Sequence, residues 1–172
     1  AVRSCWASLY TARAIYYRVK KGFKHEDVLI CVIVQKMIDS DKSGVMFTIN
    51  PVDNDKGKIS IDSAWGLGEA IVGGQVTPDH FLIDKETMQI VDKRVSKKDF
   101  MYTRDVGTGD TTKVTLTDET GSKSSLTDHE ALKLSEIGKK IEEHYGYPQD
   151  IEWAVDDNKI FILQSRPVTT MG

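Results

Sequence analysis

Four polar side chains near the C-terminal end of this 172-residue sequence could bind a metal ion and a phosphate chain. They are two carboxylates, an amide and a guanidinium: Asp150, Glu152, Gln164 and Arg166. Mg2+ in proteins usually binds one or two carboxylates together with substrate phosphates, and an arginine binds phosphate oxygens through two parallel N–H groups. The alternative is a solvated strand face with a surface Asp–Arg pair, which contributes less than ~1 kcal/mol.

The elements that must position these side chains are predicted to form a β-hairpin. Two β-rich runs, 150–155 and 160–166, flank a turn, and side chains two residues apart on a strand share a face. A two-residue turn at Asp157-Asn158 would pair Glu152 with Leu163 and separate the polar side chains, because a one-residue slip exchanges the two faces. We predict instead a three-residue loop, 156–158, with Asn158 in the left-handed region. This loop pairs Asp150 with Gln164, Glu152 with Ile162, and Trp153 with Phe161.

Composition limits the classes of protein to which the chain can belong. Its 40% hydrophobic and 28% charged residues are typical of a soluble domain, and its length fits one domain. A formal net charge of -3 offers no basic surface for nucleic acid, and the longest apolar run, 28–34, is too short to span a membrane. Cys5 and Cys31 match no metal-site spacing, so we expect reduced thiols, in the core or at its boundary, in a cytoplasmic protein.

The hydrophobic pattern predicts an α+β fold with a mainly antiparallel sheet and flanking helices. We expect helices at 2–20 and 127–145, ended by Gly22 and Gly146, with a capping box of Thr127 and Glu130 on the second. We expect strands at 28–34, 45–49, 58–64, 81–84 and 90–95, the first of them covered on both sides. Residues 96–125 are predicted to form short exposed strands or mobile loop, with Lys97 and Lys98 on a solvated surface rather than at a phosphate.

The residues that follow the predicted buried strand are candidates for nucleotide contact. Gln35, Lys36 and Met37 could form a ledge for an adenine ring, whose edge needs polar partners and whose faces need apolar contact. A strand end that turns outward explains these three residues as well.

A glycine-rich loop, Trp65-Gly-Leu-Gly-Glu69, is the second candidate. Gly66 and Gly68 allow positive φ and a close approach to phosphate, but glycines packed beneath Trp65 explain the pattern equally well. Glu69 could accept hydrogen bonds from a ribose, or it could favour the start of a short helix through its charge.

Six short motifs in order along the chain resemble the C-terminal part of the ATP-grasp nucleotide domain of the phosphoenolpyruvate synthase family, which pyruvate phosphate dikinases and rifampicin phosphotransferases share. The motifs are Val34-Gln-Lys-Met37, Ser43-Gly-Val-Met-Phe-Thr-x-Asn-Pro51, Trp65-Gly-Leu-Gly-Glu69, Thr77-Pro78, Asp150-Ile-Glu-Trp153 and Gln164-Ser-Arg-Pro167. The resemblance assigns residues 1–172 to one partial ATP-grasp domain. Independently of the resemblance, Ala1 enters mid-pattern without an initiator methionine, from which we expect a piece of a longer polypeptide.

The resemblance also implies a role for each candidate residue. Glu152 and Gln164 would be Mg2+ ligands between the β- and γ-phosphates of ATP, and Arg166 would be the catalytic phosphate clamp, supported by Asp150. The nucleotide-binding residues on the adenine and ribose side would be Gln35, Lys36, Met37 and Glu69.

The chemistry implied by the resemblance is phosphorylation of pyruvate at the expense of ATP, through a phosphohistidine on a mobile domain, with release of AMP and phosphate. The first ATP-grasp lobe, the phosphohistidine domain and the pyruvate barrel are partners that this sequence does not contain. None of its histidines has the Gly-Gly-x-Thr-Cys-His context of the carrier: His25, His80, His129 and His144. Alternatives are the nucleotide domain of a rifampicin-type antibiotic phosphotransferase and a non-catalytic ATP-sensing module.

Overall fold

The computed structural model describes residues 1–105 and 107–168, and the chain divides into two compact units, Ala1–Met37 and Ile38–Gly172. The first unit is helical. Its elements are α1 (Val2–Ala7), the 3-10 helix η1 (Ser8–Tyr10), α2 (Ala12–Lys21) and the 3-10 helix η2 (His25–Asp27). The predicted single helix is thus divided at Thr11, whose backbone is extended and whose hydroxyl accepts a hydrogen bond from Ala14 N. Gly22 ends α2 in the left-handed region, as predicted.

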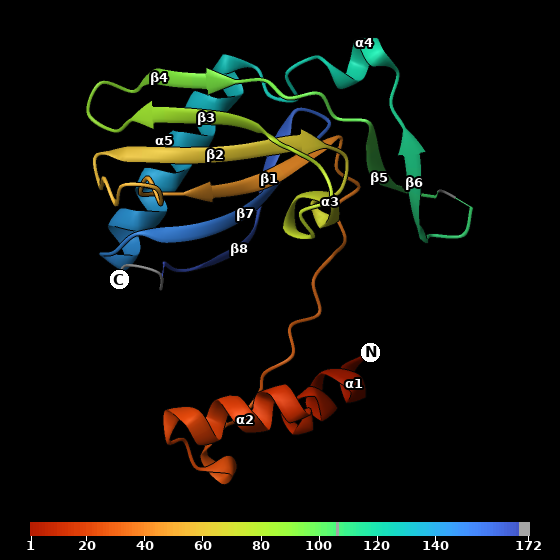
Figure 1. The fold of residues 1–172 in the computed structure, drawn as a ribbon, viewed down its shortest axis with the longest axis vertical. Helices are drawn as coiled ribbons and strands as arrows, with labels where there is room; N and C mark the ends of the chain where they lie inside the picture. Colours follow the sequence, from red (N-terminus) through yellow and green to blue (C-terminus); the bar gives the residue numbers. More distant parts are fainter. Residues whose placement is uncertain (106, 169–172) are drawn as a thin grey trace. The chain divides into compact units, whose positions relative to one another are not determined.

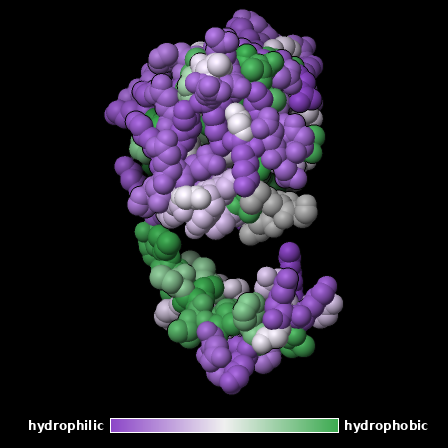
Figure 2. Space-filling view, turned by 90° about the vertical axis from the view of Figure 1, so that its left-hand side faces the viewer, coloured by the Kyte–Doolittle hydropathy of each residue, from purple (hydrophilic) through white to green (hydrophobic). Residues whose placement is uncertain are grey.

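The buried strand predicted at 28–34 is not formed. These residues lie outside any helix or strand, and Leu29, Ile33 and Val34 are 88%, 81% and 86% exposed. A strand that is buried on both faces needs paired neighbours and covering layers, and no described residue pairs with this segment. Figure 2 shows hydrophobic side chains on the surface of the first unit. Cys5 and Cys31 are free and exposed, so neither is a core thiol.

The second unit is built on a six-stranded antiparallel sheet with the order β4-β3-β2-β1-β7-β8 (Figure 1). Its strands are β1 (Lys42–Phe47), β2 (Lys58–Trp65), β3 (Asp79–Asp84), β4 (Gln89–Arg94), β7 (Gln149–Asp156) and β8 (Lys159–Pro167). Successive side chains point to opposite faces, and one face is buried, as in β3, where Asp79, Phe81 and Ile83 are buried and the residues between them are half-buried. The prediction of an α+β fold with a mainly antiparallel sheet is confirmed.

One long helix, α5 (Asp128–Tyr145), covers the apolar face of this sheet (Figure 1). The predicted capping box is present, because Thr127 accepts from Glu130 N while the Glu130 carboxylate accepts from Thr127 N, and Gly146 ends the helix at φ 79°. The core between helix and sheet includes Met46, Ile61, Phe81, Leu134 and Trp153. Burying one such side chain stabilises the fold by about 1.5–3 kcal/mol. None of the helices in the described ranges has the length and hydrophobicity that a transmembrane span requires.

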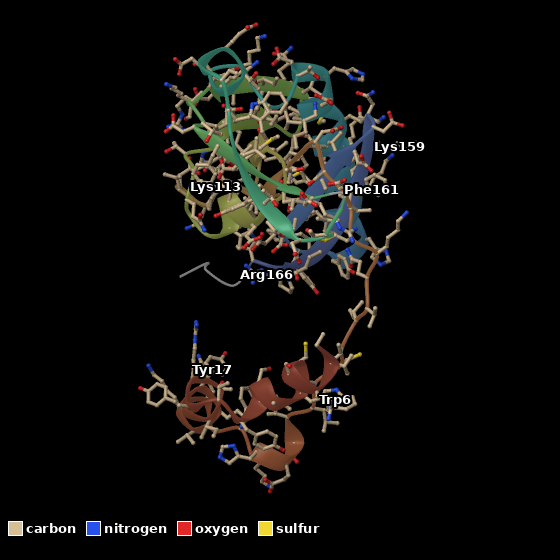
Figure 3. The ribbon with its side chains drawn as sticks, turned by 90° about the vertical axis from the view of Figure 1, so that its right-hand side faces the viewer. Trp6, Tyr17, Lys113, Lys159, Phe161 and Arg166 are labelled. Atoms are coloured by element: carbon tan, nitrogen blue, oxygen red, sulfur yellow. The ribbon has the colours of Figure 1, made fainter. Side chains whose placement is uncertain are left out.

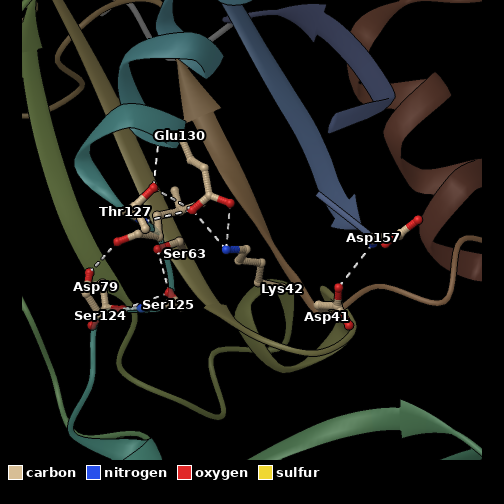
Figure 4. Close-up of polar contacts among 10 residues, drawn as sticks. Asp41, Lys42, Ser63, Asp79, Ser124, Ser125, Thr127, Glu130 and Asp157 are labelled. Atoms are coloured by element: carbon tan, nitrogen blue, oxygen red, sulfur yellow. Dashed lines mark hydrogen bonds and ion pairs between the residues drawn. The ribbon is translucent and has the colours of Figure 1, made fainter. Parts of the chain in front are cut away.

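Residues 96–105 and 107–125, called the arm below, carry a second sheet and contact β2. The arm contains β5 (Phe100–Arg104) and β6 (Thr111–Thr115), which pair as a two-stranded sheet, and the short helix α4 (Asp118–Gly121). Short strands were predicted here, but Lys98 was not predicted correctly: its side chain is fully buried and forms an ion pair with buried Asp79. Asp79 also accepts hydrogen bonds from the backbone and hydroxyl of Ser125, which in turn contacts the Ser63 hydroxyl (Figure 4).

Candidate functional site

The hairpin of β7 and β8 turns through two residues, not three. Asp157 and Asn158 both have positive φ, 47° and 59°, which is the conformation of a type I′ hairpin turn. The prediction of a three-residue loop is therefore wrong, although Asn158 is left-handed as predicted. Asp157 tolerates this region because a short polar side chain reduces the steric penalty, and its N–H donates to Asp41 Oδ2 at 3.2 Å (Figure 4).

A β-bulge in β8 corrects the register that this turn imposes. Trp153 pairs with Ile162, but the next residue, Glu152, pairs with Gln164, which leaves Leu163 as an extra residue in β8. Beyond the bulge, Asp150 lies opposite Arg166. The predicted pairs of Asp150 with Gln164, of Glu152 with Ile162 and of Trp153 with Phe161 are thus wrong.

The hairpin nevertheless has the predicted polar face. Side chains of directly opposed residues lie on the same side of a sheet, so Glu152 and Gln164 share one face with Asp150 and Arg166. Ile151 and Trp153 lie on the other face, fully buried in the core. Figure 3 labels Lys159, the first residue of β8, and Arg166, which lies one residue before its end.

Arg166 and Asp150 form an ion pair on this face. Arg166 Nε lies 2.9 Å and Nη2 2.8 Å from Asp150 Oδ2. The Asp150 side chain is 12% exposed, whereas the Arg166 side chain is 64% exposed. The carboxylate is therefore fixed close to the sheet, and the outer edge of the guanidinium remains available to a ligand.

The donor set on this face fits Mg2+ that is shared with phosphate. Glu152 offers a carboxylate and Gln164 an amide oxygen, which are hard ligands of the kind that Mg2+ prefers. In the part of the chain that the structure describes, no three side chains of His, Cys, Asp or Glu gather as a metal cluster. A cation here would need further oxygen ligands, and phosphates and water are the usual source for Mg2+.

The face continues across the sheet through residues that the sequence did not single out. Val45 of β1 lies between Glu152 and Asp62, and Phe47 lies opposite Asp150. Asp62 Oδ1 is 2.8 Å from Nδ1 of His80 on β3. Val45 and Phe47 are half-buried, so the floor beside the two carboxylates is apolar. Strand alternation identifies these neighbours only when the pairing registers of β1 with β2 and β7 are known, and the sequence does not give those registers.

The glycine-rich loop is held by protein contacts. Gly66 has φ 76°, its N–H donates to Asp41 O at 2.8 Å, and the N–H of Leu67 donates to Tyr102 O at 2.8 Å. The Gly66 carbonyl accepts from the Ser43 hydroxyl at 2.6 Å. Since both amides are engaged, this geometry favours packing over phosphate contact at Gly66. Gly68 does not use the freedom of a positive φ, because its φ is -62°.

Four candidate residues lie outside the hairpin. Glu69 begins the short helix α3 (Glu69–Val72) and is exposed, which is compatible with both of its proposed roles. Gln35, Lys36 and Met37 belong to the first unit, whereas the hairpin belongs to the second. They are exposed and follow no strand, so the structural premise for an adenine ledge, the end of a buried strand, is absent.

Comparison with known proteins gives the class and then the family. Residues 1–172 match a family model described as "Pyruvate phosphate dikinase, AMP/ATP-binding domain". This match defines the chain as a nucleotide-binding domain of the kind found in phosphotransferases. The chain belongs to the pyruvate phosphate dikinase AMP/ATP-binding domain family, which confirms the resemblance seen in its motifs.

Similar proteins include two named as phosphoenolpyruvate synthases. The chain is 52% identical to a probable phosphoenolpyruvate synthase of Pyrococcus abyssi and 50% identical to the phosphoenolpyruvate synthase of Pyrococcus furiosus; each match covers 99% of the chain and 22% of the relative. It is 41% identical to a rifampicin phosphotransferase of Bacillus cereus, over 99% of the chain and 19% of that protein. The chain thus spans about a fifth of the length of these relatives.

Proposed function

We propose that this chain is the C-terminal lobe of an ATP-grasp domain and binds the phosphates of Mg·ATP on the polar face of β7 and β8. The observation that carries the proposal is the bulged register, which places Glu152 opposite Gln164 and Asp150 opposite Arg166. Family membership adds independent support, because the matching model is an AMP/ATP-binding domain.

The chain's own residues would bind and orient the phosphates. Glu152 and Gln164 would hold Mg2+, which when bound supplies charge neutralisation between the β- and γ-phosphates. Arg166 would donate N–H groups to phosphate oxygens, and Asp150 would hold the guanidinium in place. Positioning and charge neutralisation are the main demands that phosphoryl transfer makes on a protein.

The adenosine end of the nucleotide would contact other residues. We propose Gln35, Lys36 and Met37 on the adenine side and Glu69 near the ribose, on the strength of the family resemblance.

The reaction served would be that of a phosphoenolpyruvate synthase in the cytoplasm. ATP would transfer its β,γ-pyrophosphoryl group to a histidine of another domain with release of AMP; hydrolysis would release phosphate, and the phosphohistidine would phosphorylate pyruvate at a third domain. Two observations support this assignment of the steps to separate domains. The relatives are named phosphoenolpyruvate synthases, and the chain spans 22% of their length.

The experiment that tests the reaction is product analysis of ATP turnover. The intact protein that contains this chain should form AMP, phosphate and phosphoenolpyruvate from ATP and pyruvate. The 172-residue chain alone should release no AMP. Pyruvate-dependent AMP release from the isolated chain, or ADP as the product of the intact protein, would contradict the proposal.

The rifampicin phosphotransferase relative supports a second candidate function, with the same nucleotide lobe and an antibiotic as acceptor. Offering pyruvate and a rifamycin separately to the intact protein distinguishes the two. Phosphate transfer to the rifamycin alone would replace the first proposal by the second.

A further inference from the structure

We propose that Gln149 and Ser165 are positioning residues that lock the bulge at Leu163 and so decide which face of β8 carries Gln164 and Arg166. This inference rests on the proposed function, because it concerns the placement of the proposed magnesium and phosphate ligands. Neither residue would contact the nucleotide itself.

The two-residue turn makes the bulge necessary. A regular hairpin from Asp157-Asn158 would pair Glu152 with Leu163 and Ile151 with Gln164, because the turn fixes the register of all following pairs. Gln164 and Arg166 would then lie on the apolar face. With Leu163 as an extra residue, Gln164 lies opposite Glu152 instead. A shift of the register by one residue would therefore move Gln164 and Arg166 to the face opposite Glu152.

The position of β8 in the sheet makes this register vulnerable. β8 ends the strand order and, among the strands of the described residues, pairs only with β7. An edge strand is held from one side, so a slip by one residue breaks no contact with a second neighbour. The register on the far side of Leu163 therefore depends on side-chain contacts between β7 and β8, of which the Asp150–Arg166 ion pair is one.

Gln149 and Ser165 provide a second contact, on the apolar face. The Ser165 hydroxyl donates to Gln149 Oε1 at 2.8 Å, and Ser165 lies between Gln164 and Arg166 in the chain. Gln149 is 1% exposed and is itself fixed, because its backbone N–H donates to Thr48 Oγ1 at 2.8 Å and its side chain donates to Tyr147 O at 3.1 Å. In the slipped register Ser165 would lie opposite Asp150, on the other face, and Gln149 Oε1 would lose its donor inside the core. An unpaired buried acceptor is costly, so the bond favours the bulged register.

The test combines Ser165→Ala with deletion of Leu163. Removing Leu163 leaves a regular strand in which the same turn pairs Glu152 directly with Gln164, so the bulge and its lock are no longer needed. We expect Ser165→Ala alone to weaken the backbone NOEs between Glu152 and Gln164 in the 172-residue chain. We also expect it to weaken Mg·ATP binding by the intact protein about three- to tenfold. Deletion of Leu163 should preserve both, and the double variant should recover both.

The control is Ser122→Ala, which removes an exposed hydroxyl after α4 and should change neither measurement. Unchanged Glu152–Gln164 NOEs in Ser165→Ala would overturn the inference, as would a double variant no better than Ser165→Ala, which would mean that the hydroxyl acts through packing alone. Failure of the proposed function looks different: the unaltered intact protein would bind no Mg·ATP, while the NOE measurements would still report on the lock.

Discussion

Two N–H groups of Arg166 converge on a single oxygen of Asp150, with Nε at 2.9 Å and Nη2 at 2.8 Å from Oδ2. A guanidinium has five N–H groups, so the remaining ones can bind phosphate while the pair persists. The nearly buried carboxylate thus acts as a fixed support for an exposed cation.

Replacing Asp150 by asparagine should loosen Arg166 without unfolding the protein, because the amide retains the shape but not the charge of the support. We expect Mg·ATP affinity of the intact protein to fall by about tenfold, as for other outer partners of a ligand-binding group. Isothermal titration calorimetry measures this effect. Asp92→Asn is the matched control, since Asp92 pairs with an exposed arginine, Arg94, on β4. Equal affinities of the two variants would contradict a supporting role for Asp150.

Lys98→Met should destabilise the second unit strongly, because it leaves the buried Asp79 carboxylate without its cation. Breaking a buried pair from one side costs about 3–5 kcal/mol in the free energy of unfolding. Urea denaturation of the 172-residue chain measures the loss. Lys97→Met changes the neighbouring lysine, which is exposed and pairs with exposed Asp118, and should leave the unfolding free energy nearly unchanged. Similar losses of unfolding free energy in both variants would contradict the stabilising role of the Lys98–Asp79 ion pair.

Gly66→Ala should destabilise the fold by about 2 kcal/mol or more, because the residue has positive φ and an added Cβ would meet the Tyr102 carbonyl. Gly68→Ala is the matched control, since its φ is -62° and its nearest neighbour would be the Ser43 hydroxyl at 3.6 Å. Thermal unfolding should separate the two variants. A stable Gly66→Ala protein with impaired ATP binding would instead favour phosphate contact at this glycine.

Stability should fall in acid partly through Asp84. The hydrogen bond from Lys58, with further bonds from Thr87, holds the pKa of Asp84 well below its usual range. A carboxyl whose pKa is lower in the folded state stabilises the fold above its unfolded pKa of about 4, and this contribution is lost as the pH falls below that value. Asp84→Asn should therefore lose less Tm than the unaltered chain between about pH 6 and about pH 3. Glu86→Gln, an exposed neighbour, should behave like the unaltered chain; an unchanged pH dependence in Asp84→Asn would contradict the assignment.

Local signals predicted most elements of the second unit. The capping box of Thr127 and Glu130 and the stop at Gly146 were readable because each depends on a few neighbouring residues. The strand predicted at 28–34 failed because an apolar β-rich run specifies a strand only where other strands pair with it. Burial of Lys98 also escaped prediction, since its partner Asp79 lies 19 residues earlier in the chain and no local pattern joins them.

The candidate site was predicted in residue type and face, but not in register. Alternation placed Asp150 and Glu152 on one side of β7, and this depends only on strand geometry. The pairing across to β8 depends on a turn with two left-handed residues and on a bulge at Leu163, and neither has an unambiguous sequence signature. The predicted face is nevertheless right, because the predicted pairs differ from the observed ones by two residues, Ile162 against Gln164 opposite Glu152, and residues two apart on a strand share a face.

The most direct test of the account is the magnesium dependence of ATP binding by Glu152→Ala in the intact protein, compared with Glu143→Ala, which changes an exposed glutamate of α5. We predict that Glu152→Ala lowers ATP affinity at least about tenfold when Mg2+ is present and has little effect when Mg2+ is chelated, since Glu152 would act through the metal. Glu143→Ala should match the unaltered protein in both conditions. Magnesium-dependent ATP affinity that is the same in Glu152→Ala and the unaltered protein would contradict the assignment of this hairpin as the nucleotide site.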